Sequence, residues 1–424
     1  MNKKIFIKTF GCQMNKSDST RLREKFLFLG YSMTENKDMA DVLIYNTCSV
    51  RAHAENRAMS HLGRLKFLKR KNEEVKICVV GCMAQRMKKE ITTRLPHVDF
   101  VVGPSKMMEL PETLENKKKG IFFDRKDTSK RFPSVIKDFV KTDDSASGYV
   151  PVMKGCNNYC AYCIVPYVRG REQYRPVKDI INDCENLSGK GIKEILLLGQ
   201  TVNSHPNFKQ ILKRVSRIDG LSEVKFVTSY PGYMNKETVD LVIENKVLSN
   251  YFHLPIQSGS NKVLKKMNRK YSVEHYLDIT RYIRHRAPDA GISTDIIVGF
   301  PGEDEDDFKK TLSVVEEIEF DQCFTFKYSP RPNTKASSMN DDVDDKTKKK
   351  RLAKLNRICG KYSFKRNKRM EGKKVKVLAK EHNSGRTESN KIVFWEGKKA
   401  GPDDEVKVVV TRGLAHSLKG DRIE

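Results

Sequence analysis

The chain has 424 residues, 38% of them hydrophobic, which suits two or three domains with real cores and excludes a disordered polymer. Its net charge of +27 and pI of about 9.6 favour nucleic acid as a partner, although a lysine-biased proteome would give a similar composition. No apolar stretch could cross a membrane and no signal peptide is evident, so we expect a cytoplasmic protein. Ten cysteines then favour metal or redox chemistry over disulfides.

The first hundred residues alternate apolar runs with amphipathic segments, a pattern that predicts an open parallel α/β domain. Strands are expected at residues 5–10, 42–46, 75–81 and 98–104, and helices at 17–30 and 51–70. The first helix would begin with Ser17 or Asp18 as its N-cap and would stop at Gly30. The polar, weakly patterned residues 118–145 are expected to form a linker.

Six further apolar runs alternate with helical spacers from Val150 onward, at 149–155, 194–200, 224–230, 252–258, 292–300 and 323–329. They predict a partial (β/α)6 barrel with its chemistry at the carboxyl ends of the strands, with a doubly wound sheet as the alternative. A very basic helical stretch, 341–374, precedes short β-type runs that predict a small five-stranded barrel of the oligonucleotide-binding kind.

Three cysteines stand close together after the first expected barrel strand, with the spacing Cys156-x-x-x-Cys160-x-x-Cys163. Thiolates so spaced can bind three irons of a [4Fe–4S] cluster and leave the fourth iron open for S-adenosylmethionine (SAM). The alternatives are a zinc knuckle that lacks its fourth ligand and three incidental thiols, but structural zinc sites use four ligands, and no fourth Cys or His lies nearby. The spacing therefore predicts an iron–sulfur cluster that binds SAM.

Another three cysteines, Cys12, Cys48 and Cys82, each follow an expected strand of the N-terminal sheet. Parallel strands place their carboxyl ends at one edge, so these thiols are expected to converge and hold a second [4Fe–4S] cluster. Structural burial is the alternative. Cys78 lies in mid-strand and is expected in the core. The three remaining cysteines are expected to be packing residues: Cys184, Cys323 and Cys359.

At these cysteines the chain resembles the methylthiotransferases of the radical SAM superfamily, over essentially its whole length. The matching segments are TFGCQMNKSDS, VLIYNTCSVR, GCMAQR, GCNNYCAYCIVPYVRGRE, LLLGQTVNS, HLPIQSGSNKVLKKMNR, DIIVGFPGE, YSPRPNT and GRTESNKIVFWEG. The resemblance implies an N-terminal methylthiotransferase domain (1–117), a linker (118–145), a radical SAM domain (146–360) and a C-terminal RNA-gripping TRAM domain (361–424).

The resemblance also implies the reaction. An enzyme of this family would install a 2-methylthio group on N6-isopentenyladenosine next to the anticodon of tRNA, using two SAM molecules per turnover. The cluster of Cys156, Cys160 and Cys163 would cleave SAM, and the auxiliary cluster held by Cys12, Cys48 and Cys82 would deliver sulfur. Breaking an aromatic C–H bond is beyond side-chain acids and bases, which fits a cofactor-based mechanism.

Residues expected in the SAM pocket lie in or after the expected barrel strands. Tyr162 would shield the cluster and contact the adenine of SAM, with ordinary packing as an equal alternative. Polar groups at strand ends would face the pocket: Gln200, Ser229 and Gln257. A glycine-rich turn after the fifth strand would let backbone approach adenine closely: Gly299, Gly302 and Glu303.

The RNA-binding surface is expected on the basic stretch, where eight cations would track phosphates: Lys348, Lys349, Lys350, Arg351, Lys365, Arg366, Lys368 and Arg369. A solvated helix face is the alternative. Phe394 and Trp395 would stack a base or form the core of the small barrel. The target adenine would leave a single-stranded loop such as the anticodon loop.

Partners expected besides tRNA are an electron donor such as a flavodoxin or ferredoxin and a sulfur source for the auxiliary cluster. We expect a monomer without membrane contact. Two other functions are weighed: the same chemistry on threonylcarbamoyl-adenosine or on a ribosomal-protein aspartate, and a non-catalytic iron–sulfur RNA-binding protein. A non-catalytic protein, such as a redox sensor, has no need of an open iron inside six β/α units, and this argues against the non-catalytic function.

Overall fold

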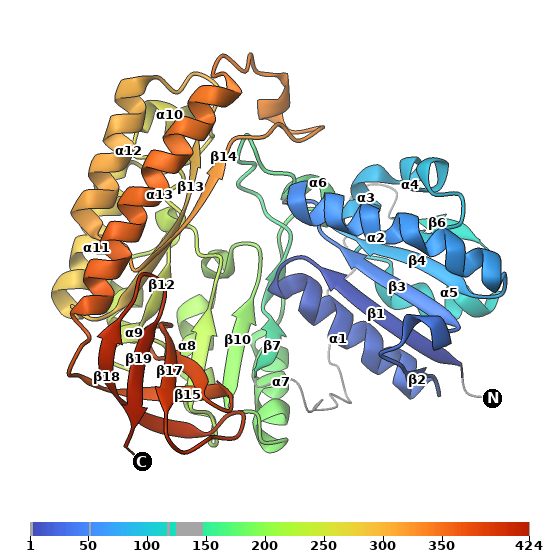
Figure 1. The fold of residues 1–424 in the computed structure, drawn as a ribbon, viewed down its shortest axis with the longest axis horizontal. Coiled ribbons are helices and arrows are strands. Elements are labelled where there is room, and N and C mark those ends of the chain that lie inside the picture. The colour runs from blue at the N-terminus through green and yellow to red at the C-terminus, as the bar shows by residue number, and fades with distance from the viewer. Residues whose placement is uncertain (1–2, 51, 117–118, 124–146, 424) are drawn as a thin grey trace. The chain divides into compact units, whose positions relative to one another are not determined.

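The computed structural model describes residues 3–50, 52–116, 119–123 and 147–423, and backbone contacts divide the chain into two compact units (Figure 1). Unit 1 contains residues 1–140, 153–157 and 163–175, and unit 2 contains residues 141–152, 158–162 and 176–424. Residues 124–145, most of the expected linker, lie outside the described residues. None of the described helices is long and apolar enough to span a membrane.

Unit 1 is built on a six-stranded parallel sheet with the strand order β2-β1-β3-β4-β5-β6. Every residue of β3 is buried, as expected for a central strand whose two faces are both covered. The predicted open parallel α/β domain is confirmed. The strands are β1 (Lys4–Phe10), β2 (Ser32–Met33), β3 (Val42–Thr47), β4 (Lys76–Gly81), β5 (Phe100–Val102) and β6 (Gly120–Phe122).

Helices cover both faces of this sheet. One core contains Leu22 and Phe26 of α1 (Gln13–Phe28) with Leu110 of α5 (Leu110–Asn116). The opposite core contains side chains of α2 (Ala52–Lys71), α3 (Cys82–Met87) and α4 (Lys89–Arg94). The chain segments 153–157 and 163–175 add a short hairpin, β8 (Met153–Lys154) with β9 (Gln173–Tyr174), and α6 (Val165–Arg169).

Two details of unit 1 differ from the sequence prediction. The prediction of Ser17 or Asp18 as N-cap is wrong, because α1 begins four residues earlier with Cys12 in the N-cap position, and both residues are buried within the helix. The expected linker begins with a strand, since β6 pairs in parallel with β5. Gly30, with φ of +83°, ends the α1 segment as predicted.

Unit 2 contains six parallel strands that follow one another in chain order, in two three-stranded sheets: β7-β10-β11 and β12-β13-β14. Val224 of β11 bonds to Val247 and Ser249, just before β12, so backbone hydrogen bonds continue past the end of the first sheet. This order has no reversal, so the partial barrel is confirmed and the doubly wound alternative is wrong. The strands are β7 (Gly148–Pro151), β10 (Glu194–Leu198), β11 (Glu223–Phe226), β12 (Tyr251–His253), β13 (Gly291–Val298) and β14 (Gln322–Lys327).

Amphipathic helices separate these strands, and Figure 1 shows α11, α12 and α13 side by side. The helices are α7 (Val177–Gly189), α8 (Phe208–Val215), α9 (Lys236–Ile243), α10 (Asn261–Lys266), α11 (Val273–Arg286), α12 (Glu305–Ile318) and α13 (Asp345–Lys368). The expected domain boundary between residues 360 and 361 falls inside α13.

The C-terminal strands close into a barrel with the order β15-β16-β17-β19-β18, which confirms the predicted small five-stranded barrel. Its core is apolar and includes Val377, Trp395, Val408 and Leu418. Along β18 these inward valines alternate with exposed residues, as expected for strands with one buried face. The strands are β15 (Lys374–Glu381), β16 (Ser384–Thr387), β17 (Ile392–Glu396), β18 (Glu405–Gly413) and β19 (Leu418–Arg422).

Candidate functional site

The cysteines of the N-terminal sheet lie where the sequence predicted, directly after three neighbouring strands. Register pairs Phe10 of β1 with Thr47 of β3, and Thr47 with Gly81 of β4. Cys48 and Cys82 are the next residues after this aligned row, and Cys12 follows two residues after Phe10. All three thiols therefore lie at one edge of the sheet.

The three thiols are close enough to influence one another electrostatically. Burial raises the pKa of Cys82 to about 12, nearby Arg169 lowers it, and Cys48 and Cys12 raise it further. Sulfur also accepts hydrogen bonds here: the Val50 amide donates to Cys48 Sγ at 3.3 Å, and Arg169 Nε donates to Cys82 Sγ at 3.3 Å. Such donors favour thiolate, the form that binds iron.

Two fully buried asparagines connect the loops that carry these cysteines. Asn15 Nδ2 donates to Asn46 Oδ1 at 2.9 Å, and Asn46 Nδ2 donates to the Asn15 carbonyl at 2.8 Å. The Cys12 thiol donates to Asn15 Oδ1 at 3.3 Å. Gly81, with φ of +95°, lies so close that a Cβ would stand 2.5 Å from Asn46 Oδ1. The pair thus fixes the strand ends before Cys48 and Cys82.

The second cysteine set lies on the loop between β8 and α6, and all three thiols are partly exposed. Within unit 1, the Cys156 amide donates to the Gly170 carbonyl at 3.2 Å. Within unit 2, Arg269 Nη1 donates to Cys160 Sγ at 3.4 Å and Arg269 Nη2 donates to the Pro255 carbonyl at 2.8 Å. Across the described residues, no three Cys, His, Asp or Glu side chains could hold a single metal ion, as a mononuclear site would require.

Four residues expected in the SAM pocket belong to unit 2. Tyr162 packs partly buried against a core cluster, with its ring edge-on to Phe300 at 6.5 Å. Ser229 is buried, and its hydroxyl has no hydrogen-bond partner among the described residues. Gln257 is buried with φ of +70° and bridges to β13 through its backbone, while Gln200 is partly buried after β10. A buried hydroxyl without a partner fits a polar ligand.

The glycine-rich turn after β13 forms hydrogen bonds and close contacts with other residues of unit 2. The Glu303 carboxylate accepts from the Gly299 amide at 2.7 Å and from Arg351 Nη1 at 2.8 Å. Burial raises the pKa of Glu303 to about 7, although both of these donors lower it. A Cβ on Gly299 would meet Lys348 Cγ at 2.3 Å, so this side chain occupies the space beside the turn.

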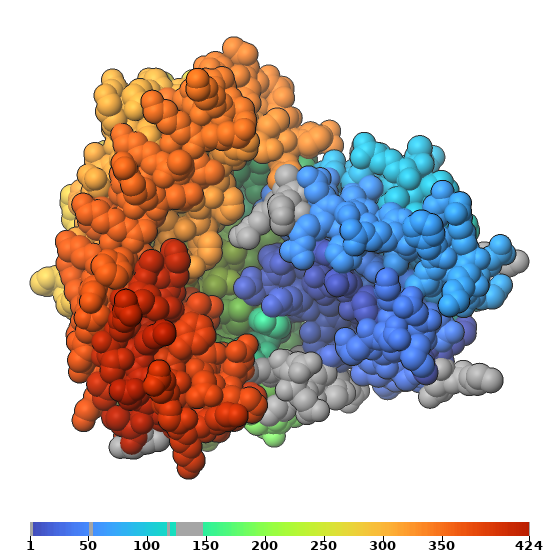
Figure 2. Space-filling model, in the orientation of Figure 1, coloured from blue at the N-terminus to red at the C-terminus, as the bar shows by residue number. Residues whose placement is uncertain are grey.

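The cations expected to bind RNA fall into two groups on α13. Three are buried and form ion pairs inside the protein, so the prediction that they contact phosphates is wrong. The pairs are Lys348 with Asp341, Arg351 with Glu303, and Arg366 with Asp321. The other five are exposed on the outer face, which Figure 2 shows in orange: Lys349, Lys350, Lys365, Lys368 and Arg369. The side chain of Phe394 is 47% exposed. Trp395 instead lies in the barrel core, which was one of the two roles expected for it.

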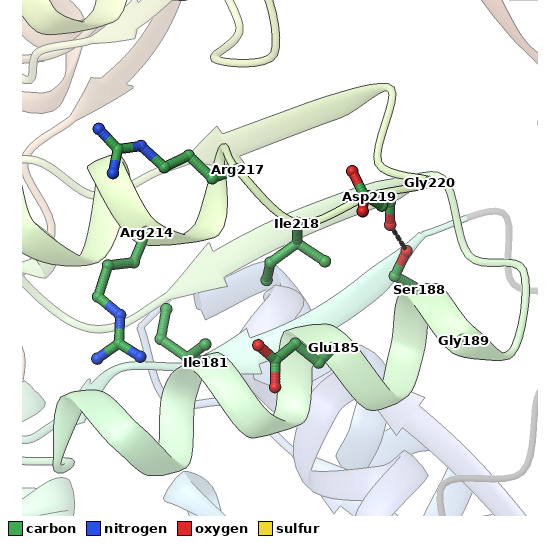
Figure 3. A pocket seen from close by; sticks show the side chains of 9 residues that line it. All are labelled: Ile181, Glu185, Ser188, Gly189, Arg214, Arg217, Ile218, Asp219 and Gly220. Carbon is green, nitrogen blue, oxygen red and sulfur yellow. Dashed lines mark hydrogen bonds between the residues drawn. The ribbon is translucent and has the colours of Figure 1, made fainter.

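A surface recess of about 750 Å³ lies between α7 and α8 (Figure 3). Arg214 and Arg217 line one side, and Ser188 Oγ donates to the Asp219 carbonyl at 2.5 Å on the other. The recess contains no cysteine and none of the residues expected to bind a cofactor or RNA.

The structure reveals residues around the cysteines that sequence reasoning missed. They are Arg169, Asn15, Asn46 and Arg269. All four lie in the segments that resemble the family, and that resemblance was the one sequence signal that could have pointed to them. Their partners are far away in sequence: Arg169 and Cys82 are separated by 87 residues, and Arg269 and Cys160 by 109. Spacing alone therefore could not pair them. Cys78 and Cys184 are buried, as predicted for core residues.

Comparison with known proteins first defines the class. Residues 150–315 match the family model for the Radical SAM superfamily, and residues 4–103 match Uncharacterized protein family UPF0004. Among solved structures, a radical SAM methyltransferase, TsrM from Kitasatospora setae, has a TM-score of 0.62 at 13% identity and covers 80% of this chain and 74% of its own. The fold is thus that of a radical SAM enzyme.

Full-length relatives then define the family. The tRNA-2-methylthio-N(6)-dimethylallyladenosine synthase of Thermodesulfovibrio yellowstonii is 40% identical over 99% of this chain and 98% of its own. The enzyme of the same name from Clostridium novyi is 41% identical over 100% of this chain and 97% of its own. The chain belongs to this family of radical SAM methylthiotransferases, whose cofactors are [4Fe–4S] clusters and SAM.

Proposed function

We propose that this enzyme installs a 2-methylthio group on N6-isopentenyladenosine next to the anticodon of tRNA. The observation that carries the proposal is the match of the whole chain to synthases named for this product, together with two separate sets of three cysteines. No feature of the described residues favours threonylcarbamoyl-adenosine or a protein substrate.

In this proposal each cysteine set holds one cluster. Cys156, Cys160 and Cys163 bind the cluster that chelates SAM, and Cys12, Cys48 and Cys82 bind the auxiliary cluster. When bound, these groups and SAM supply the 5′-deoxyadenosyl radical and the sulfur that carries the methyl group. The donor sets suit this role, because thiols are the preferred ligands of iron–sulfur clusters, and each set leaves one iron open for a ligand.

The chain's own contribution is to bind and orient. Asn15 and Asn46 hold the loops of the auxiliary set, and Arg269 donates to the sulfur of Cys160. The buried Ser229 hydroxyl supplies a polar partner for SAM. Tyr162, packed on Phe300, shields the SAM side of the cluster from water.

RNA binding is assigned to the exposed face of α13 and the adjoining barrel. Besides the five cations already placed there, α13 exposes Lys346, Lys354 and Arg357. Three acidic residues pair with cations of this set: Asp345 with Lys349, Glu319 with Lys365 and Arg369, and Glu371 with Lys368. Such a strip attracts the phosphate backbone without regard to sequence. The exposed Phe394 ring on β17 offers a surface for stacking a base.

The remaining partners follow from the chemistry. Reductive cleavage of SAM needs a low-potential electron donor such as a flavodoxin or ferredoxin, and repeated turnover needs a sulfur source. We place the reaction in the cytoplasm, where tRNA is modified, and propose that a monomer carries it out.

The test is anaerobic reconstitution, followed by mass spectrometry of nucleosides from tRNA carrying either isopentenyl- or threonylcarbamoyl-adenosine. The wild-type enzyme should give methylthio product on the first tRNA alone. Cys12→Ala should still release 5′-deoxyadenosine from SAM but give no methylthio product, and Cys160→Ala should lose both. Cys78→Ala, at a core cysteine of β4, the strand that ends just before Cys82, is the matched control and should retain both. Normal product from Cys12→Ala would refute the assignment of the auxiliary cluster.

A further inference from the structure

Arg169, the last residue of α6, connects a cysteine of the auxiliary set to an acidic residue of α1. Its Nε donates to Cys82 Sγ at 3.3 Å, and its Nη2 donates to Asp18 Oδ2 at 2.8 Å. The side chains of Arg169 and Asp18 are only 8% and 12% exposed. Both bonds lie within unit 1. A guanidinium held this way directs one N–H group to sulfur, while a carboxylate anchors it through another N–H group.

The short helix that carries Arg169 packs directly on the helix that Cys82 begins. Cys82 of α3 forms one buried cluster with Ile164 and Val168, which flank and belong to α6. Ile164 follows Cys163 immediately, so the chain leaving the second cysteine set runs straight into this contact. Residues 163–175 therefore fold with the N-terminal sheet.

The turn after Arg169 reaches the other cysteine set. Gly170, with φ of +79°, accepts the hydrogen bond from the Cys156 amide at 3.2 Å. A Cβ on Gly155 would stand 2.0 Å from the Arg171 carbonyl, so the two backbone segments are in close contact. Two consecutive residues, Arg169 and Gly170, thus contact one cysteine of each set.

We infer that Arg169 is a positioning residue for the auxiliary cluster: its guanidinium, anchored by Asp18, holds Cys82 and sets the reduction potential of the cluster. This inference rests on the proposed function, since it assigns Cys82 to that cluster. Three thiolates leave the oxidised cluster with a net negative charge, which a buried guanidinium offsets. Hydrogen bonds to sulfur and local charge are the principal protein controls on cluster potential.

A purely structural role would be an ion pair that fastens α6 to α1. The two roles differ in what charge changes do. If Arg169 acts on the cluster, Arg169→Gln removes a cation and exposes the cluster to the Asp18 carboxylate, so the potential falls. Asp18→Asn removes an anion, so the potential rises. A structural ion pair predicts loss of thermal stability in both variants and no opposite shifts.

The experiment uses the full chain with Cys156, Cys160 and Cys163 replaced by alanine, so that one cluster of four irons is loaded under anaerobic reconstitution. Iron content is counted, and the midpoint potential is measured by a redox titration followed by electron paramagnetic resonance. We expect Arg169→Gln to shift the potential downward, Asp18→Asn upward, and Arg169→Lys less than Arg169→Gln, because lysine keeps the charge.

The matched control is Lys69→Gln. Lys69 belongs to α2, is paired with Asp99 at side-chain exposures of 16% and 1%, and donates to the Val75 carbonyl just before β4, at the end of that strand away from Cys82. Its potential should equal that of the parent. Equal potentials in Arg169→Gln, Asp18→Asn and the parent, with four irons each, would overturn the inference and leave the proposed function intact. Failure of the parent to bind iron would overturn the cysteine assignment and the inference with it.

Discussion

Asp321, just before β14, has a buried carboxylate that links the C-terminal barrel to other strands and helices of unit 2 through hydrogen bonds and ion pairs. Its carboxylate accepts from Lys391 Nζ at 2.5 Å, from Arg284 Nη2 at 2.9 Å and from the Ile292 amide at 2.9 Å, and Arg366 Nε lies 3.5 Å away. Lys391 precedes β17 of the barrel, whereas the other partners come from α11, β13 and α13. We therefore expect Asp321→Asn to loosen the barrel.

The magnitude follows from two arguments that agree. Burial would raise the pKa of Asp321, but Lys391, Arg284 and Arg366 hold it at about 2, against an ordinary value of 3.8. That gap corresponds to about 2–3 kcal/mol of stability, present above pH 3.8 and lost as the pH falls through about 2. Removing one member of a buried charge network typically costs about 3–5 kcal/mol. At neutral pH the variant should thus lose about 3 kcal/mol.

The assay is urea unfolding of the full chain, combined with hydrogen exchange of β15–β19. The matched control is Asp289→Asn, which breaks an exposed pair with Lys373 at 2.6 Å and should cost less than about 1 kcal/mol. Exchange should accelerate in the barrel strands of Asp321→Asn alone. Equal losses in the two variants would show that the buried network contributes no more than a surface ion pair.

Three further outcomes are expected. The pKa of Glu303 is raised to about 7 from 4.5, so the folded protein keeps a proton that the unfolded chain loses. The free energy of unfolding should therefore fall by about 3 kcal/mol between pH 4.5 and 7. Urea unfolding at both pH values should show a smaller fall for Glu303→Gln. Gly81→Ala should abolish loading of the auxiliary cluster, measured by iron content, because its Cβ would stand 2.6 Å from a backbone carbonyl, while Gly63→Ala, with open space around it, should load normally. Replacing Lys349 and Lys350 by glutamine should weaken tRNA binding and lower the salt dependence of the affinity by about two phosphate contacts, and an unchanged slope would exclude α13 from the interface.

The fold could be predicted in large part because most of its strands are recognisable from their apolar composition. All six strands of the partial barrel were predicted within a few residues, since most of them contain apolar runs such as ILLL at residues 195–198 of β10. Three short strands were missed: β2, β6 and β9. Strand β6 has three residues and only partly buried side chains, so nothing in its sequence separates it from a polar linker. Short edge strands depend on their neighbours rather than on their own pattern.

The site could be predicted at the level of ligands but not of their surroundings. The strand-end rule located Cys12, Cys48 and Cys82, because position within a parallel sheet follows from local sequence. Burial of Lys348, Arg351 and Arg366 on the inner face of α13 was not predictable from charge, since their carboxylate partners lie on separate elements. A basic helix therefore looks like one charged surface in sequence, although in the fold three of the eight cations expected to bind RNA are buried and ion-paired.

Asp18 illustrates both what the sequence could predict and what it could not. Its type and place before an amphipathic run made it a reasonable N-cap, and the helix instead begins at Gln13, which turns the carboxylate inward to Arg169. An acidic residue buried within a helix needs a compensating cation, and the partner that supplies it comes from residues 163–175, beyond the second cysteine set. Because these residues fold into unit 1, the chain that carries Cys163 and the edge that carries Cys82 share one packed core. The spacing of Cys163 and Cys82 is accordingly fixed by side-chain packing within a single folding unit.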